Sequence, residues 1–241
     1  MPNQYHKPGE QRAEKVQELF GAIAPRYDLI NDVQSFGLHR RWKRRVVKLA
    51  RLSAGDRALD LCCGTGDLTF ALAARGAEAV GLDFSEPMLA EARKKTSASK
   101  QQTPTFIAGD AQRLPFPDCA FDVITVGYGL RNLASWEAGL AEMIRVARPG
   151  ARLLVLEFGK PDNAGWRGLY FGYLKVFVPL FGLVFCRNAS AYSYILESLK
   201  HYPAQRGVEA KMRESGLTNV RVENLLGGAM SINYGEKAGP K

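Results

Sequence analysis

From residue 57 onward, short apolar segments of strand length alternate with segments of helical length, and this alternation constrains the fold more than any other feature. We expect strands at 58–61, 79–82, 105–108, 121–126 and 152–158. Between them we expect helices at 67–75, 86–95 and 136–146. Such a βαβα pattern is typical of a parallel sheet with helices on both faces.

The C-terminal part of the chain is expected to add antiparallel strands to the edge of this sheet. After a helix expected at 208–215, strand candidates at 220–226 and 230–234 flank the turn residues Gly227 and Gly228. Two short strands around a Gly-Gly turn predict a hairpin, which would pair antiparallel with the rest. The chain is therefore expected to be an α/β protein with a mostly parallel seven-stranded sheet.

The length of 241 residues and the 46% hydrophobic content fit one domain with additions. We expect a helical N-terminal extension or lid at 1–52, broken near Pro25, and a cofactor-binding core at 53–160. An apolar insertion facing substrate or membrane follows at 161–205, and a C-terminal helix and hairpin at 206–241.

Cysteine usage and the N-terminus indicate a cytoplasmic protein. The four cysteines include no CxxC pair, and the first ten residues lack the apolar core of a secretory signal.

The net charge of +9 favours an anionic partner, which is either nucleic acid or a phospholipid surface.

The turn after the first expected strand, residues 60–66 (DLCCGTG), is the strongest candidate for a ligand site. Gly64 and Gly66 let the backbone approach a ligand, and the following helix directs free N–H groups at an anionic or carboxylate group. Asp83, about 20 residues further on, is placed to accept hydrogen bonds from both hydroxyls of a ribose. The alternatives are an ordinary βα turn and an Asp83 that only caps the next helix.

Three further residues favour S-adenosylmethionine over a dinucleotide. A dinucleotide fingerprint needs a small residue where this chain has Thr69. Asp60 is placed to hold a positively charged amino group, and Asp110, in the segment Gly109-Asp110-Ala111, is placed to meet an adenine amino group. No metal is required for this chemistry.

Motifs outside the cofactor turn carry a more specific resemblance. They are the residues 20–28 (FGAIAPRYD), 31–32, 35–43, 129–132 (GLRN), 153–158 and 192–203. Over about residues 16–234 the chain resembles the C-methyltransferases of menaquinone and ubiquinone biosynthesis. The resemblance implies a Rossmann-like class I methyltransferase fold and methylation of a carbon on a reduced quinone ring.

The resemblance also assigns cofactor contacts. It places them on Thr65, Asp83, Asp110 and Ala111, and on Gly127, where the family often has a serine and this chain offers only backbone. With the residues argued above, the expected cofactor-binding set is Asp60, Gly64, Thr65, Gly66, Asp83, Asp110, Ala111 and Gly127.

Methylation of a ring carbon is favoured when a neighbouring hydroxyl ionises, so the site should stabilise a phenolate or accept its proton. Arg131 and Asn132, just beyond the fourth expected strand, are the catalytic candidates, with capping of the next helix as the alternative. Tyr27, His39 and His201 are the candidates for binding substrate. For Tyr27 a helix-end role, and for the histidines a packing or surface role, is the alternative.

The expected substrate is demethylmenaquinol, an isoprenoid hydroquinone; the benzoquinol precursor of ubiquinone, another lipophilic molecule or RNA are the alternatives. The chain shows neither an RNA-binding appendage nor an aromatic stacking platform, which argues against nucleic acid. A hydroquinone with a long tail lies in the bilayer, so we expect peripheral contact with the inner face of the membrane. A homo-oligomer is compatible with the sequence.

Two segments are candidates for that membrane contact. The basic run at 40–51, which contains Trp42, suits anionic headgroups, with a solvated helix face as the alternative. The apolar stretch 169–186 is interrupted by Lys175 and Pro179, so we interpret it as a lid or tail-binding helix pair and not as a transmembrane segment.

Overall fold

The computed structural model describes residues 21, 24, 27–97, 103–186, 196 and 198–239, with the backbone alone for 177–186. Most of the predicted helix before Pro25, and residues 192–195 and 197 of the motif at 192–203, lie outside these residues. The strands are β1 (Arg57–Leu61), β2 (Glu78–Asp83), β3 (Thr105–Ala108), β4 (Phe121–Gly127), β5 (Ala147–Phe158), β6 (Leu217–Leu225) and β7 (Met230–Lys237). The helices are α2 (Tyr27–Ser35), α3 (Leu38–Ala50), α4 (Asp67–Ala73), α5 (Glu86–Ser97), α6 (Trp136–Val146), α7 (Ala164–Cys186) and α9 (Ala204–Glu214), with short 3₁₀ turns η2 (Leu130–Asn132) and η3 (Leu226–Gly228).

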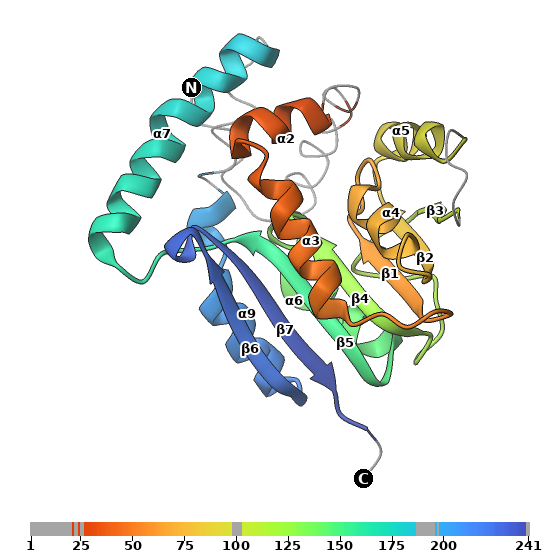
Figure 1. The fold of residues 1–241 in the computed structure, drawn as a ribbon. Coiled ribbons are helices and arrows are strands. Elements are labelled where there is room, and N and C mark those ends of the chain that lie inside the picture. Colours follow the sequence, from red (N-terminus) through yellow and green to blue (C-terminus); the bar gives the residue numbers. More distant parts are fainter. Residues whose placement is uncertain are drawn as a thin grey trace.

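The seven strands form one sheet in the order β3-β2-β1-β4-β5-β7-β6, as Figure 1 shows. β1 to β5 pair in parallel, and β7 pairs antiparallel with both β5 and β6. The predicted sheet and its C-terminal hairpin are thereby confirmed. The hairpin turns at Gly227 and Gly228, both of which have positive φ.

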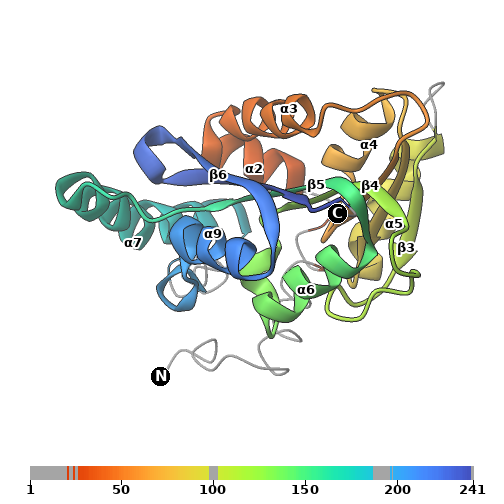
Figure 2. The same cartoon turned by 90° about the horizontal axis from the view of Figure 1, so that it is seen from below.

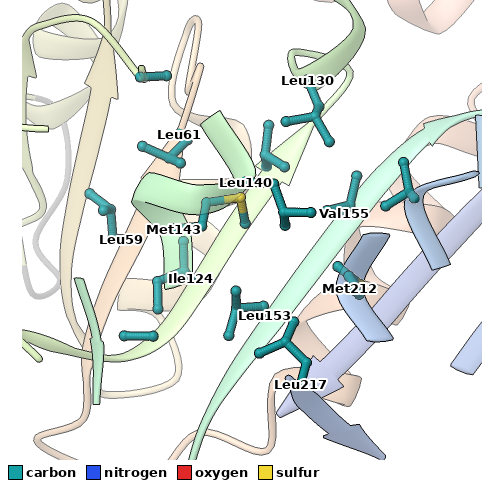
Figure 3. Packing of buried hydrophobic residues seen from close by; sticks show 14 of the residues in the cluster. Leu59, Leu61, Ile124, Leu130, Leu140, Met143, Leu153, Val155, Met212 and Leu217 are labelled. Carbon is teal, nitrogen blue, oxygen red and sulfur yellow. The ribbon is translucent and has the colours of Figure 1, made fainter. Parts of the chain in front are cut away.

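The central strands β1 and β4 are buried on both faces, because successive side chains point into two separate cores. Leu59 and Ile124 lie in one core, beneath α6 and α9, whereas Ala58 and Val123 lie in the other, beneath α3 and α4. Figure 2 shows α3 and α4 on one side of the sheet and α6 and α9 on the other. Figure 3 shows the packing in the first core.

Two predicted boundaries are wrong for identifiable reasons. β5 begins at Ala147 and not at 152, because Ala147 pairs with Phe121 before an irregularity that contains Gly150. α9 begins at Ala204, which is buried, so the helix starts before the apolar spacing that predicted a start at 208.

The apolar stretch 169–186 is part of one helix, α7, and is not the predicted helix pair. Pro179 lies within this helix, which continues past it without a break. A proline removes only one backbone donor, and a long helix can accommodate that locally. None of the helices in the described part of the chain combines the length and the apolar character that crossing a bilayer requires.

Candidate active site

The polar residues predicted to bind ligand meet at one edge of the sheet. In parallel strands the carboxyl ends share an edge, and here β3, β2, β1 and β4 are consecutive neighbours. Asp60 lies in β1, Asp83 ends β2, and the Gly109-Asp110 turn follows β3. The Gly109 N–H donates to the Asp83 carbonyl over 3.0 Å, which joins the turn after β3 to the end of β2.

At two glycines around this edge, an added side chain would clash with a neighbouring side chain. Gly66 has φ 83°, and a Cβ there would lie 2.7 Å from the ring of Phe106. A Cβ on Gly129 would lie 2.2 Å from the Cβ of Cys62. The second contact brings the loop after β4 against the glycine turn after β1, so the two predicted motifs form one site.

Asp83 ties the glycine turn to the end of β2. One carboxylate oxygen accepts the Gly64 N–H at 2.8 Å, and the other accepts the Ser85 N–H at 2.9 Å. Burial raises the pKa of Asp83, while these backbone donors oppose the rise. Asp83 is therefore more than a helix cap, because it connects two turns that are far apart in the chain.

Asp60 is a buried carboxylate held by two hydroxyl groups. Thr69 donates to one oxygen at 2.7 Å and Thr125 to the other at 2.8 Å. Burial raises the pKa of Asp60 to about 6, and the two hydroxyl donors partly offset that effect. Thr69, which in sequence only excluded a dinucleotide fingerprint, thus orients the acid that precedes the turn.

The N-terminal helix α2 is fastened to the glycine turn. Thr65 donates its hydroxyl to Asp28 at 2.6 Å, and Lys95 contacts Asp28 at 2.6 Å and Asp67 at 3.0 Å. Tyr27 lies over Gly64, where an added Cβ would be 3.8 Å from its ring. Burial raises the pKa of Tyr27 to about 12. α2 accordingly covers the turn, and the Thr65 hydroxyl hydrogen is already used in holding it.

The remaining predicted cofactor residues lie around the same edge. Asp110 is exposed and accepts the Gln112 N–H at 2.8 Å, whereas Ala111 is buried. Gly127 ends β4, and a Cβ added there would be 3.7 Å from Leu68, an ordinary contact. A Cβ would therefore fit at this position.

Arg131 forms a buried ion pair with Glu157. Its guanidinium contacts the Glu157 carboxylate and donates to the Tyr128 carbonyl at 2.7 Å, and it lies 4.6 Å over the ring of Phe158. Asn132 donates to the same Tyr128 carbonyl at 3.2 Å. These two residues hold the loop around Tyr128, which has a positive φ of 62°.

The alternative role for Arg131 and Asn132, capping of the next helix, is filled by another residue. Ser135 is the N-cap of α6, and its hydroxyl accepts the Ala138 N–H at 3.1 Å. Arg131 and Asn132 lie in η2, before that helix begins. They are therefore available to shape the site at the sheet edge.

Sequence reasoning assigned no role to Glu157 or Thr125. Glu157 is the one acid in the apolar run 153–158, and a lone charge there signals a buried partner. Thr125 lies on β4 opposite Asp60 in the parallel register. That pairing follows from strand order, which the sequence does not reveal.

The two histidines predicted to bind substrate differ in burial. His39 is buried at the junction of α2 and α3, with its ring 2.8 Å from the Ser35 hydroxyl. Burial and the nearby Lys43 lower the pKa of His39. His201 is exposed at the end of a helical segment. No group of three or more candidate metal ligands occurs within the described ranges.

Comparison with known proteins gives consistent matches over nearly the whole chain. The model of the ubiE/COQ5 methyltransferase family matches residues 8–237. A ubiquinone/menaquinone biosynthesis C-methyltransferase from Azotobacter vinelandii is 41% identical over 95% of this chain and 92% of its own length. A demethylmenaquinone methyltransferase from Thermus thermophilus is 44% identical over 91% of this chain and 100% of its own.

The fold is also found among solved structures. An S-adenosylmethionine-dependent methyltransferase from Aquifex aeolicus superimposes with a TM-score of 0.57 at 18% identity. The match covers 80% of this chain and 88% of that one. At this identity the likeness concerns the fold alone.

The buried ion pair gives a stability prediction. Arg131→Met leaves the Glu157 carboxylate buried without its countercharge, so we expect a loss of about 3–5 kcal/mol in the free energy of unfolding. Adding Glu157→Gln removes the stranded charge, and the one amide oxygen that remains can still accept one of the two backbone N–H groups, of residue 131 and of Phe158, that the carboxylate accepts. Urea denaturation should therefore find the double variant more stable than Arg131→Met alone; a double variant less stable than the single one would contradict this.

Proposed function

The chain belongs to the ubiE/COQ5 methyltransferase family, and on that premise we propose that it methylates a ring carbon of demethylmenaquinol, using S-adenosylmethionine, in menaquinone biosynthesis. Relatives named demethylmenaquinone methyltransferase support the naphthoquinol. Relatives named for both quinones keep the benzoquinol precursor as the second candidate. The observation that carries the proposal is the contact of Gly129 with Cys62, which joins the Arg131 loop to the glycine turn.

The residues at the edge fit S-adenosylmethionine. The hydroxyl of Ser85, beside Asp83, is buried and has no hydrogen-bond partner among the described residues. Asp60 is a buried carboxylate whose ionised form a positive amino group would favour. We assign cofactor binding to Asp60, Gly64, Thr65, Gly66, Asp83, Asp110, Ala111 and Gly127. When bound, S-adenosylmethionine supplies an electrophilic methyl group.

The chain's own contribution to the reaction lies in favouring the ionised ring hydroxyl. Arg131 lies in η2, just beyond β4, and hydrogen bonds from guanidinium N–H groups stabilise a developing phenolate. Glu157 balances the charge of Arg131 and holds its direction. Asn132 supports the same loop through the Tyr128 carbonyl. We therefore assign the catalytic role to Arg131 and Asn132, and assign Tyr27 on α2 to covering the substrate.

We also propose that α3 contacts an anionic membrane surface, through fewer residues than the whole basic run. Arg40, Lys43 and Arg45 already form ion pairs. Trp42 is buried in the core beneath α3 and cannot reach a membrane, because helical spacing puts it on the face with Val46. The exposed cations at spacings of three and four, on one helix face, are Arg41, Arg44 and Lys48. They form no ion pair within the described part of the chain.

Exposed apolar side chains on α7 also support contact with a membrane. Leu169 and Val176 are 66% and 60% exposed, although both are large hydrophobic residues. α7 extends away from the sheet in Figures 1 and 2 and touches α2, where the Tyr173 hydroxyl lies 3.3 Å from the Gln34 carbonyl. We propose that this helix contacts the isoprenoid tail of the substrate.

Transfer of a labelled methyl group tests the proposed function. With labelled S-adenosylmethionine, we expect the protein to methylate reduced demethylmenaquinone faster than the reduced benzoquinone precursor, and neither oxidised quinone, because only the reduced ring is electron-rich. Faster transfer to the benzoquinol would establish the second candidate. Transfer to neither would overturn the substrate assignment.

Vesicle sedimentation tests the membrane contact. At about 1 kcal/mol per basic residue, the triple variant Arg41→Gln, Arg44→Gln, Lys48→Gln should bind vesicles containing phosphatidylglycerol roughly 100-fold more weakly than the wild type. A control triple removes the same charge from exposed sites elsewhere: Arg75→Gln, Lys94→Gln and Arg113→Gln. Equal losses in the two triples would show that net charge, and not the α3 face, is responsible.

A further inference from the structure

Three buried tyrosine hydroxyls near Arg131 and Glu157 have no hydrogen-bond partner among the described residues. They belong to Tyr128, Tyr170 and Tyr202, here called the tyrosine trio. Buried polar atoms are bonded in the large majority of cases, and leaving one unbonded is costly. Three such atoms in one region therefore call for an explanation, and a ligand that bonds to them provides one.

The trio comes from three separate segments that converge on the buried ion pair. Tyr128 follows β4, and its carbonyl accepts the Arg131 guanidinium while its ring lies 5.9 Å from that of Phe158. Tyr170 lies on α7, and Tyr202 follows the helical turn at 198–201. Both pack in the core cluster that contains Leu130, with Phe158 against it.

Electrostatics agree with this placement. Burial raises the pKa of all three phenols, and for each the charge of Glu157 adds to the rise while that of Arg131 opposes it. The phenols consequently stay protonated at neutral pH and act as hydrogen-bond donors. A protonated phenol that donates to nothing in the protein is suited to a ligand oxygen.

We propose that the tyrosine trio binds the two ring oxygens of the hydroquinone and so orients the ring carbon to be methylated beside Arg131. This inference rests on the proposed function and adds the residues that recognise the substrate ring. A hydroquinone carries two oxygens on opposite sides of a flat ring, each able to accept a hydrogen bond. Because the two oxygens lie far apart on the ring, one donor cannot reach both, whereas hydroxyls from three different segments can.

Tyr170→Phe and Tyr202→Phe test the proposal, because each removes one oxygen and keeps the packed ring. We expect the KM for reduced demethylmenaquinone with a short isoprenoid tail to rise roughly three- to tenfold in each variant. The KM for S-adenosylmethionine should stay unchanged. The thermal midpoint should stay the same or increase, since the lost hydroxyl made no bond within the protein.

Tyr234→Phe is the matched control. Tyr234 lies on β7, where it pairs with Leu154 of β5, and it is as deeply buried, but its hydroxyl already bonds to Glu236. Its loss should lower the thermal midpoint and leave the quinol KM unchanged.

The outcomes separate this inference from the proposed function. A wild-type protein that methylates neither quinol overturns both. An active wild type whose quinol KM is unchanged in Tyr170→Phe and Tyr202→Phe overturns the inference alone. A rise in quinol KM accompanied by an equal rise for S-adenosylmethionine, or by a fall in thermal midpoint like that of Tyr234→Phe, also overturns it, because the hydroxyls would then be structural.

Discussion

Two buried carboxylates, Asp60 and Asp83, occupy the carboxyl ends of adjacent strands, and the rest of the site depends on how they are held. Because both faces of the sheet are covered, this edge is where polar groups from several strands can meet. Thr69 and Thr125 fix Asp60, and the N–H groups of the two following turns fix Asp83. These contacts fix the position of the glycine turn.

The same edge of the sheet connects the proposed cofactor site with the loop proposed to act in catalysis. On one side, Thr65 and Lys95 hold Asp28, so α2 lies across the glycine turn. On the other side, the contact between Gly129 and Cys62 places the Arg131 loop next to that turn. The residues proposed to bind the cofactor, the covering helix and the group proposed to stabilise a phenolate therefore belong to one connected arrangement, and a shift in any of them would reach the others.

The sequence predicted the sheet, its hairpin and the residues at its edge, because strand periodicity and glycine turns are local signals. It did not predict which residues hold them. Thr125 reaches Asp60 only because β4 lies beside β1, and Glu157 meets Arg131 only because β5 lies beside β4. Trp42 illustrates the opposite error, since a local run of basic residues suggested a surface role for a side chain that tertiary packing buries.

The pH dependence of ligand affinity tests the central claim most directly, that Asp60 receives the positive amino group of the cofactor. Burial raises the pKa of Asp60 to about 6, and a bound cation would lower it, so cofactor binding below that pH should release a proton. Titration with S-adenosylhomocysteine should show affinity rising about tenfold from pH 5 to pH 7 in the wild type. Asp60→Asn should bind more weakly and without this rise; the same pH profile in both proteins would contradict the account.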